Sequence, residues 1–205
     1  LLAAAASSAS AQWDWRGTMD TTDLPAGAQL GASAAIWGDR LVVGAPGFVD
    51  PEGRAVGAAL VYERVGRFWT GPTVLLAPGG AEGDEFGQSV AMCCDTMIIG
   101  APGADLVGGN TGSVYVYTYS GPGTWELYAI VQHQDPVGCE RFGWSCSLSS
   151  DVAVIGAWSD DPLCEGHEAA FVFEFIHGGW LQRARLEGQF RDGSEEYAYS
   201  VATSD

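Results

Sequence analysis

The sequence predicts an all-β protein, a β-propeller built from four-stranded antiparallel blades. Two observations carry this prediction: a block of about 56 residues recurs along the chain, and each block holds short runs rich in β-branched and aromatic residues. No stretch carries a sustained helical period. Four-stranded antiparallel sheets that recur every ~40–60 residues are typical of propeller blades.

The repeat is marked by a few residues at constant spacing. It starts near residues 30, 86, 142 and 197, so that successive starts lie 56, 56 and 55 residues apart. In the second copy, Phe86-Gly87 is followed by Gly100-Ala101-Pro102. An aspartate recurs before the second apolar run, at positions 39, 95 and 151, and a tryptophan lies 17 residues before each start, at positions 13, 69, 125 and 180.

Each block is expected to form four short strands, which in the second block cover residues 86–93, 97–100, 112–119 and 125–132. The short link at Cys94-Asp95-Thr96 suits a hairpin. Ala101-Pro102-Gly103 ends the second strand, because proline lacks the N–H for a ladder bond and glycine permits a sharp turn. We expect the repeated glycines where backbones approach closely, the repeated tryptophans between neighbouring sheets, and the repeated aspartates in turns, bonding their own backbone.

Phe-Gly followed by Gly-Ala-Pro is the signature of FG-GAP repeats, and residues 12–205 resemble the N-terminal propeller of integrin α chains. The second repeat keeps both halves of the motif, whereas the first starts with Leu30 and the third has Trp158 in place of the proline. The resemblance implies a seven-bladed ring. The chain accounts for about three full blades plus partial blades at the ends, so we expect a fragment of such a ring, closed by the remaining blades or by a partner chain.

Residues 1–11 are similar to the end of a secretory signal peptide, since the apolar run Leu1–Ala6 leads to Ala9-Ser10-Ala11, a pattern that signal peptidase cuts. An alanine-rich tail is the alternative. We expect a mature chain from residue 12 that is secreted or held at the cell surface. With 9 basic and 26 acidic residues the net charge is −17, which argues against nucleic acid and anionic membranes as partners. No apolar run reaches the roughly 18 residues of a membrane span, so direct membrane insertion is not expected.

A ligand site is expected on the loops that follow each Gly-Ala-Pro and on the links between blades. Trp158 replaces a proline at the base of such a loop and is the leading candidate for an exposed contact, with Asp105, Asp160 and Asp161 as charged neighbours. The partner would be an extracellular protein or glycan, and the acidic surface favours one that is cationic or bridged by calcium.

No cofactor is expected. Integrin-type repeats often carry an Asp-x-Asp-x-Asp-Gly calcium loop between the first two strands, but the corresponding links here are short and hold one carboxylate each, so those sites are not carried over. Calcium bound at Asp160 and Asp161, with Glu165 nearby, is the alternative.

Five cysteines leave at least one unpaired in a secreted protein. Cys139 and Cys164 fall in loops expected on the same face, so we predict a disulfide between them; a zinc site that adds His133 and His167 is the alternative. Cys146 is predicted to be a buried thiol, and the adjacent Cys93 and Cys94 to remain thiols rather than form a strained bridge.

Sequence motifs for catalysis are absent: no Gly-x-Ser-x-Gly elbow, His-Glu-x-x-His pair or phosphate-binding glycine loop occurs. A binding or adhesion module is therefore favoured over an enzyme. The alternatives are an accessory or catalytic propeller domain of an extracellular hydrolase or lyase, and a structural module without a specific ligand.

Overall fold

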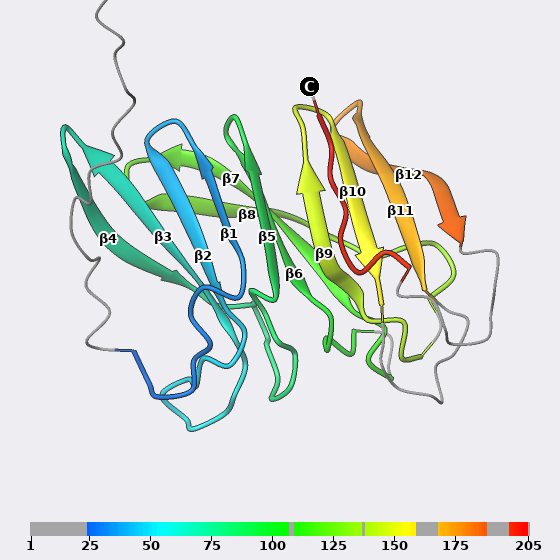
Figure 1. The fold of residues 1–205 in the computed structure, drawn as a ribbon, viewed down its shortest axis with the longest axis horizontal. Helices are drawn as coiled ribbons and strands as arrows, with labels where there is room; N and C mark the ends of the chain where they lie inside the picture. The colour runs from blue at the N-terminus through cyan, green and yellow to red at the C-terminus, as the bar shows by residue number, and fades with distance from the viewer. Residues whose placement is uncertain (1–23, 107–108, 137, 159–167, 188–196, 205) are drawn as a thin grey trace, which may run out of the picture.

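Three four-stranded antiparallel sheets stand side by side in the computed structural model, which describes residues 24–106, 109–136, 138–158, 168–187 and 197–204 (Figure 1). The first blade holds β1 (Ala34–Trp37), β2 (Arg40–Ala45), β3 (Ala58–Val65) and β4 (Phe68–Leu75). The second holds β5 (Ser89–Cys93), β6 (Thr96–Ala101), β7 (Ser113–Gly121) and β8 (Thr124–Val131). The third holds β9 (Phe142–Leu148), β10 (Val152–Ala157), β11 (Ala169–Ile176) and β12 (Gly179–Glu187).

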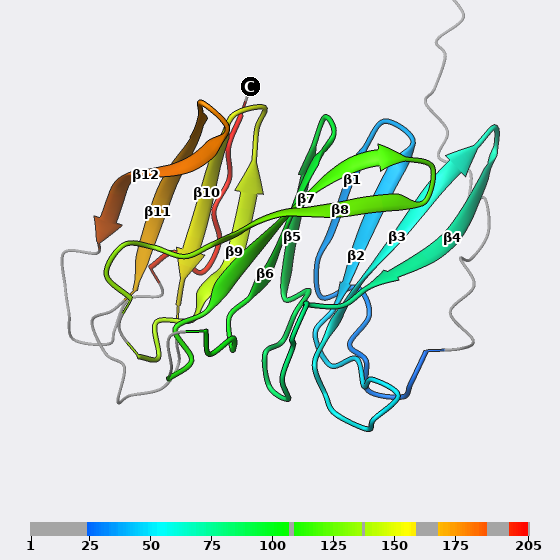
Figure 2. The same cartoon turned by 180° about the vertical axis from the view of Figure 1, so that it is seen from behind.

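The sheets are arranged as consecutive blades of a β-propeller, which confirms the predicted fold class. Within each sheet, every strand pairs with its neighbours in the sequence. The first strands of the blades lie beside one another, β1 against β5 and β5 against β9, while β4, β8 and β12 lie at the outside (Figures 1 and 2). The strands of the second blade agree with the expected ranges, except that β5 begins at Ser89 and Phe86 forms an isolated parallel bridge with Gly57.

Phenylalanine from the Phe-Gly pair fills the space between adjacent blades. Phe86 is fully buried between the first two blades and packs edge-on against Tyr115 of β7, with ring centroids 5.2 Å apart. Phe142 is fully buried between the second and third blades and packs edge-on against Phe171 of β11 at 5.3 Å. Such edge-to-face pairs add to the hydrophobic stabilisation of burial. Each blade interface is therefore built on the same aromatic anchor.

Glycine in Gly-Ala-Pro is required by a close backbone approach from the next repeat. A Cβ atom on Gly100 would lie 2.0 Å from the carbonyl oxygen of Gly143, which belongs to the next Phe-Gly pair. The hydroxyl of Ser89 donates a hydrogen bond to this same carbonyl at 2.7 Å. The arrangement recurs at the other steps, with Gly44 and Ser33 on the carbonyl of Gly87, and Gly156 and Ser145 on the carbonyl of Ala198. The expected close approach is thus confirmed.

Segment 197–204 lies alongside β9 and continues this pattern (Figure 1). Its Ala198 carbonyl accepts the Ser145 hydrogen bond at 2.9 Å, and its Thr203 amide donates to the Ser147 hydroxyl at 2.8 Å. The last described residues therefore meet the third blade as each earlier Phe-Gly segment meets the blade before it. The expected leader at 1–11 and the first recurring tryptophan, Trp13, lie outside the described residues.

The recurring tryptophans on the outer strands pack against apolar clusters, and for Trp125 and Trp180 these clusters lie between neighbouring sheets, as expected. Trp125 is buried among the residues between the first two blades, Trp180 packs against the cluster between the second and third, and Trp69 packs against the first blade's other apolar cluster. Among the described residues, no helix is long and apolar enough to cross a membrane.

The repeated aspartates act differently from the expectation. In each turn the backbone carbonyl of the aspartate accepts a hydrogen bond from an N–H of the third strand, for example Tyr119 to Asp95 at 2.8 Å. The Asp95 carboxylate binds Arg40 of the neighbouring blade at 2.8 Å, and Asp39 pairs with Arg64. The side chains of Asp39 and Asp95 therefore reach to arginines, whereas the Asp151 carboxylate accepts a hydrogen bond from the Ser150 hydroxyl of its own turn at 3.4 Å.

Candidate functional site

The loops that follow β2 and β6 and the links between blades emerge at one end of the molecule, drawn at the bottom of Figure 1. We call this end the loop face; its described part comprises residues 46–57, 76–88, 102–106, 109–112, 132–136 and 138–141 together with the starts of the first strands. In the first two blades, the loop is bonded to the link that leads to the next blade: Gly83 donates its N–H to the carbonyl of Ala55 at 2.9 Å, and Phe142 to that of Thr111 at 3.0 Å. The loop face is therefore held by backbone hydrogen bonds between neighbouring repeats.

An aromatic cluster lies on this face where β9 begins and β10 ends. The rings of Trp144 and Trp158 are 4.7 Å apart, and Tyr199 packs edge-on against Trp158 at 4.9 Å. Both tryptophans are half-buried and Tyr199 is 49% exposed. We call these three residues the aromatic cluster. They come from three separate places in the sequence, so the cluster exists only when the third blade and the segment after it are assembled.

An arginine borders the cluster. The guanidinium of Arg141 lies 5.1 Å from the ring centre of Trp144 and forms an ion pair with Glu85 of the preceding link. A cation near an aromatic face is attracted by the negative ring quadrupole. Arg141 thereby connects the link before the second blade to the tryptophans of the third. The arrangement offers partly exposed aromatic faces beside a positive and a negative charge.

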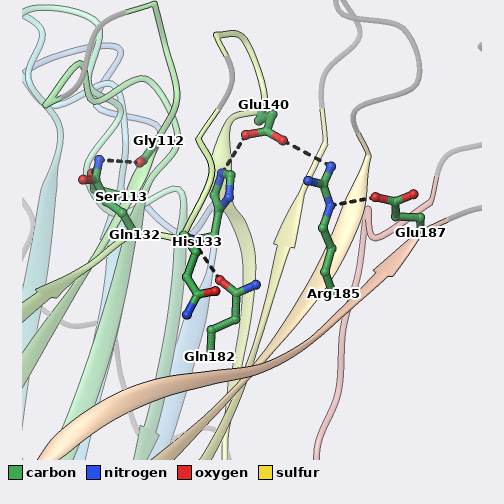
Figure 3. A network of polar contacts seen from close by, with 9 residues as sticks. Gly112, Ser113, Gln132, His133, Glu140, Gln182, Arg185 and Glu187 are labelled. Atoms are coloured by element: carbon green, nitrogen blue, oxygen red, sulfur yellow. Dashed lines mark hydrogen bonds and ion pairs between the residues drawn. The ribbon is translucent and has the colours of Figure 1, made fainter.

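A second polar site is buried beneath the link between the second and third blades (Figure 3). His133 Nε2 lies 2.6 Å from Glu140 Oε2, and both side chains are almost completely buried. Arg185 on β12 approaches the other oxygen of Glu140 at 3.4 Å and binds Glu187 at 3.0 Å. The His133 ring stacks on Phe171 with centroids 4.6 Å apart. We call His133, Glu140 and Arg185 the buried ion network.

The buried ion network acts as a structural element, since the side chains of His133 and Glu140 are almost completely buried. Charges removed from water are tolerated only when they are paired and hydrogen-bonded. Additional bonds tie the link down: the N–H of Gln134 donates to Gln182 Oε1 at 3.0 Å (Figure 3). The network thus fixes the link 132–141, from which Arg141 and the start of β9 reach the aromatic cluster.

Two carboxyl groups in the loops have altered proton affinity. Asp84 is buried, and this burial, together with the charge of Asp105, raises its pKa in spite of a hydrogen bond from the N–H of Ala81. Asp50 also loses solvent, but hydrogen bonds from the backbone and side chain of Arg54, at 2.9 and 2.8 Å, outweigh that effect and lower its pKa. Both carboxyl groups are thus engaged in holding their loops.

The comparisons with known proteins agree with this architecture. The FG-GAP repeat family matches the chain twice, over residues 69–117 and 125–173. The chain therefore contains two FG-GAP repeats. Each matched FG-GAP segment runs from the outer strand of one blade to the third strand of the next, so it includes one buried phenylalanine anchor. Integrin alpha-7 of Homo sapiens is 34% identical over 120 residues, which cover 57% of this chain and 10% of the integrin.

Of the predicted site residues, the structure places one in the aromatic cluster and another in a loop contact, and the others lie outside the described residues. Trp158 lies in the aromatic cluster, against Trp144 and Tyr199. Asp105 lies in the loop after β6, where its carboxylate accepts the backbone N–H of Asn110, so it is used to shape that loop. Asp160 and Asp161, like Glu165, lie outside the described residues. In the described part of the chain, no group of three or more His, Cys, Asp or Glu side chains is placed to hold a metal ion.

Cys139 is disulfide-bonded, and its predicted partner Cys164 lies outside the described residues, so the pairing itself stays a prediction. Cys146 is a thiol in contact with Ser89 Oγ at 3.1 Å. Although part of the residue is exposed, burial of the sulfur raises the pKa of the Cys146 thiol to about 12.

Sequence reasoning missed Trp144, Tyr199, Glu140 and Arg185, and it considered His133 only as a ligand of the alternative zinc site. For the aromatic residues a signal was available: Trp144 and Tyr199 occupy the position two residues after the start of their repeats, where Gln88 stands in the second. In the folded chain, the side chains at this position in the third and fourth repeats, Trp144 and Tyr199, lie close together. For Glu140 a weak signal was available, since an acidic residue stands two positions before three of the repeat starts, at Asp84, Glu140 and Glu195. Arg185 has no counterpart in the other repeats, so the sequence offers no signal for it.

Proposed function

We propose that this chain is the ligand-binding part of an adhesion-type propeller that works outside the cell or at its surface. The aromatic cluster on the loop face is the observation that carries the proposal. Exposed tryptophan and tyrosine rings fixed by their neighbours are enriched where proteins bind partners, because they bury a large area at little entropic cost. The matches to FG-GAP repeats and to an integrin support the same class of role.

The ligand in this proposal is an extracellular protein or a glycan that contacts Trp158, Trp144 and Tyr199. The net charge of −17 favours a partner with cationic groups around this contact. Binding should then weaken as salt rises, since exposed charges are screened over about 8 Å at physiological ionic strength. The proposed site uses side chains alone and needs no metal ion; chelation by EDTA should leave binding unchanged. Loss of binding in EDTA would instead favour the calcium alternative at Asp160 and Asp161.

An extracellular location is part of the proposal. The disulfide at Cys139 supports it, because disulfides form and persist in oxidising compartments. The leader expected at residues 1–11 would direct the chain there.

The test measures binding of the purified chain to immobilised extracellular-matrix proteins and immobilised polysaccharides. Trp158→Ala should weaken the strongest interaction by at least about tenfold, the usual range for a central aromatic contact. Trp37→Ala is the matched control, because Trp37 is 41% exposed but lies at the opposite end of the blades, where β1 turns into β2. Equal effects of the two substitutions, or no binding at all, would refute the loop-face site. Release of reducing sugar from a polysaccharide would instead favour the hydrolase or lyase alternative.

A further inference from the structure

The turn between β5 and β6 holds two adjacent cysteines in contact. The Sγ atoms of Cys93 and Cys94 are 3.1 Å apart, and both residues are thiols. Cys93 closes β5 with a buried side chain, whereas Cys94 is exposed in the turn. This turn lies at the end of the blades opposite the loop face (Figure 1), so it is separate from the proposed ligand site.

A cysteine at position 94 is not explained by the backbone of the turn. Cys94 has φ of +59°, a left-handed conformation that residues other than glycine seldom adopt. The corresponding residue of the first blade, 56 positions earlier, is Gly38, with φ of +58°. The first blade thus fills this conformation with the residue that suits it, and the second blade has a reactive side chain there instead. Local folding therefore gives no reason for the thiol.

The neighbouring blade holds this turn in place. Arg40 donates hydrogen bonds to the carbonyl of Cys94 at 2.9 Å and to the carboxylate of Asp95 at 2.8 Å. The same guanidinium lies 4.2 Å from the ring centre of Tyr119. The backbone of the turn that carries the two cysteines is therefore anchored from the neighbouring blade.

We propose that Cys93 and Cys94 form a dithiol–disulfide redox site, oxidised by a peroxide and reduced by a small thiol such as glutathione. The exposed Cys94 thiolate attacks the peroxide oxygen and becomes a sulfenic acid as the first water leaves. The Cys93 sulfur then attacks the Cys94 sulfur, a disulfide bond forms, and the second water leaves. In total the two thiols lose two protons and two electrons, and hydrogen peroxide takes them up to give two water molecules.

The resulting bridge should be easy to reduce. Alpha carbons of adjacent residues lie about 3.8 Å apart across a trans peptide, which is shorter than the ~4.4–6.8 Å usual for a disulfide. A strained bridge of this kind has a more oxidising potential than a structural disulfide. Glutathione should therefore return Cys93 and Cys94 to thiols under conditions that leave Cys139 bonded.

The experiment treats the glutathione-equilibrated full chain with hydrogen peroxide, quenches it in acid, and then labels it with N-ethylmaleimide after denaturation. Mass spectrometry of the peptide that contains residues 93–94 should show both labels lost together and a mass lower by two hydrogens, about 2 Da. Glutathione should restore both labels. If one thiol stays labelled, or if oxygen or glutathione is added to Cys94 in the unsubstituted chain, the proposal is wrong.

Three variants make the result specific. In Cys93→Ser, the sulfenic acid on Cys94 should persist and be trapped by dimedone, because the resolving thiol is gone. In Cys94→Ser, the buried Cys93 should remain reduced. Cys146→Ala is the control and should leave formation of the bridge unchanged, since Cys146 lies in the other blade interface. If Cys93→Ser fails to fold, the unsubstituted chain and Cys94→Ser still decide the outcome.

Discussion

Replacing the buried phenylalanine of a Phe-Gly pair should destabilise the protein far more than replacing an exposed one. Phe142 is fully buried and is surrounded by aromatic neighbours: Phe171 at 5.3 Å, Phe173 at 5.9 Å and His133 at 5.5 Å. Truncation of such a side chain removes its transfer free energy and leaves a cavity, a loss of about 3–5 kcal/mol. That is a large part of the roughly 5–15 kcal/mol that holds a typical domain folded.

Urea denaturation followed by tryptophan fluorescence and far-UV circular dichroism is the assay. With a slope of about 2 kcal/mol per molar urea, Phe142→Ala should lower the unfolding midpoint by roughly 1.5–2.5 M. The matched control is Phe68→Ala, because Phe68 is 69% exposed at the start of β4 and should change stability by less than about 0.5 kcal/mol. A loss below about 1 kcal/mol for Phe142→Ala, or equal losses for both variants, would refute the role of Phe142 as the anchor between blades.

Three further predictions follow from the packing. Gly100→Ala should unfold at a much lower urea concentration than Gly179→Ala. A Cβ atom at Gly100 would lie 2.0 Å from the Gly143 carbonyl oxygen, whereas a Cβ atom at Gly179 has its nearest neighbour at 4.0 Å. Equal unfolding midpoints would contradict the close approach. Glu140→Gln should cost about 3 kcal/mol in urea, because it removes the buried carboxylate charge that Arg185 and His133 approach, and a neutral result would show that the network is dispensable. Because the pKa of Asp84 is raised on folding, its contribution to the free energy of unfolding falls as pH rises from about 3.8 through the folded pKa. Asp84→Asn should flatten this decline in urea titrations at different pH values, and an unchanged slope would refute the prediction.

Much of the fold could be predicted because the repeat combines local and periodic signals. Ser113–Tyr117 reads as a strand from its own composition, and the spacing of Phe86 and Phe142 shows that the same unit follows again. The glycine of Gly-Ala-Pro was correctly tied to a close approach. Its physical cause, the carbonyl of the next Phe-Gly pair, became visible only when neighbouring repeats were placed together.

The site was less predictable because it depends on contacts between repeats. Trp158 stood out since it breaks the repeat, and it does lie in the aromatic cluster. Asp105 was chosen for its charge alone, and it turned out to bond its own loop. Asp95 was expected to bond its own turn, and its carboxylate instead binds Arg40 of the preceding blade. A carboxylate near a turn has many partners within reach, and sequence does not say which element will pack beside it.

The aromatic cluster gives the most direct test, because its members come together only if the blades and the segment after them pack as described. In a labelled sample, nuclear Overhauser spectroscopy should show cross-peaks between the ring protons of Trp158 and those of both Trp144 and Tyr199, whose ring centres lie 4.7 and 4.9 Å from it. If no cross-peak connects Tyr199 to either tryptophan, the packing of successive repeats and the binding site built on it are both contradicted.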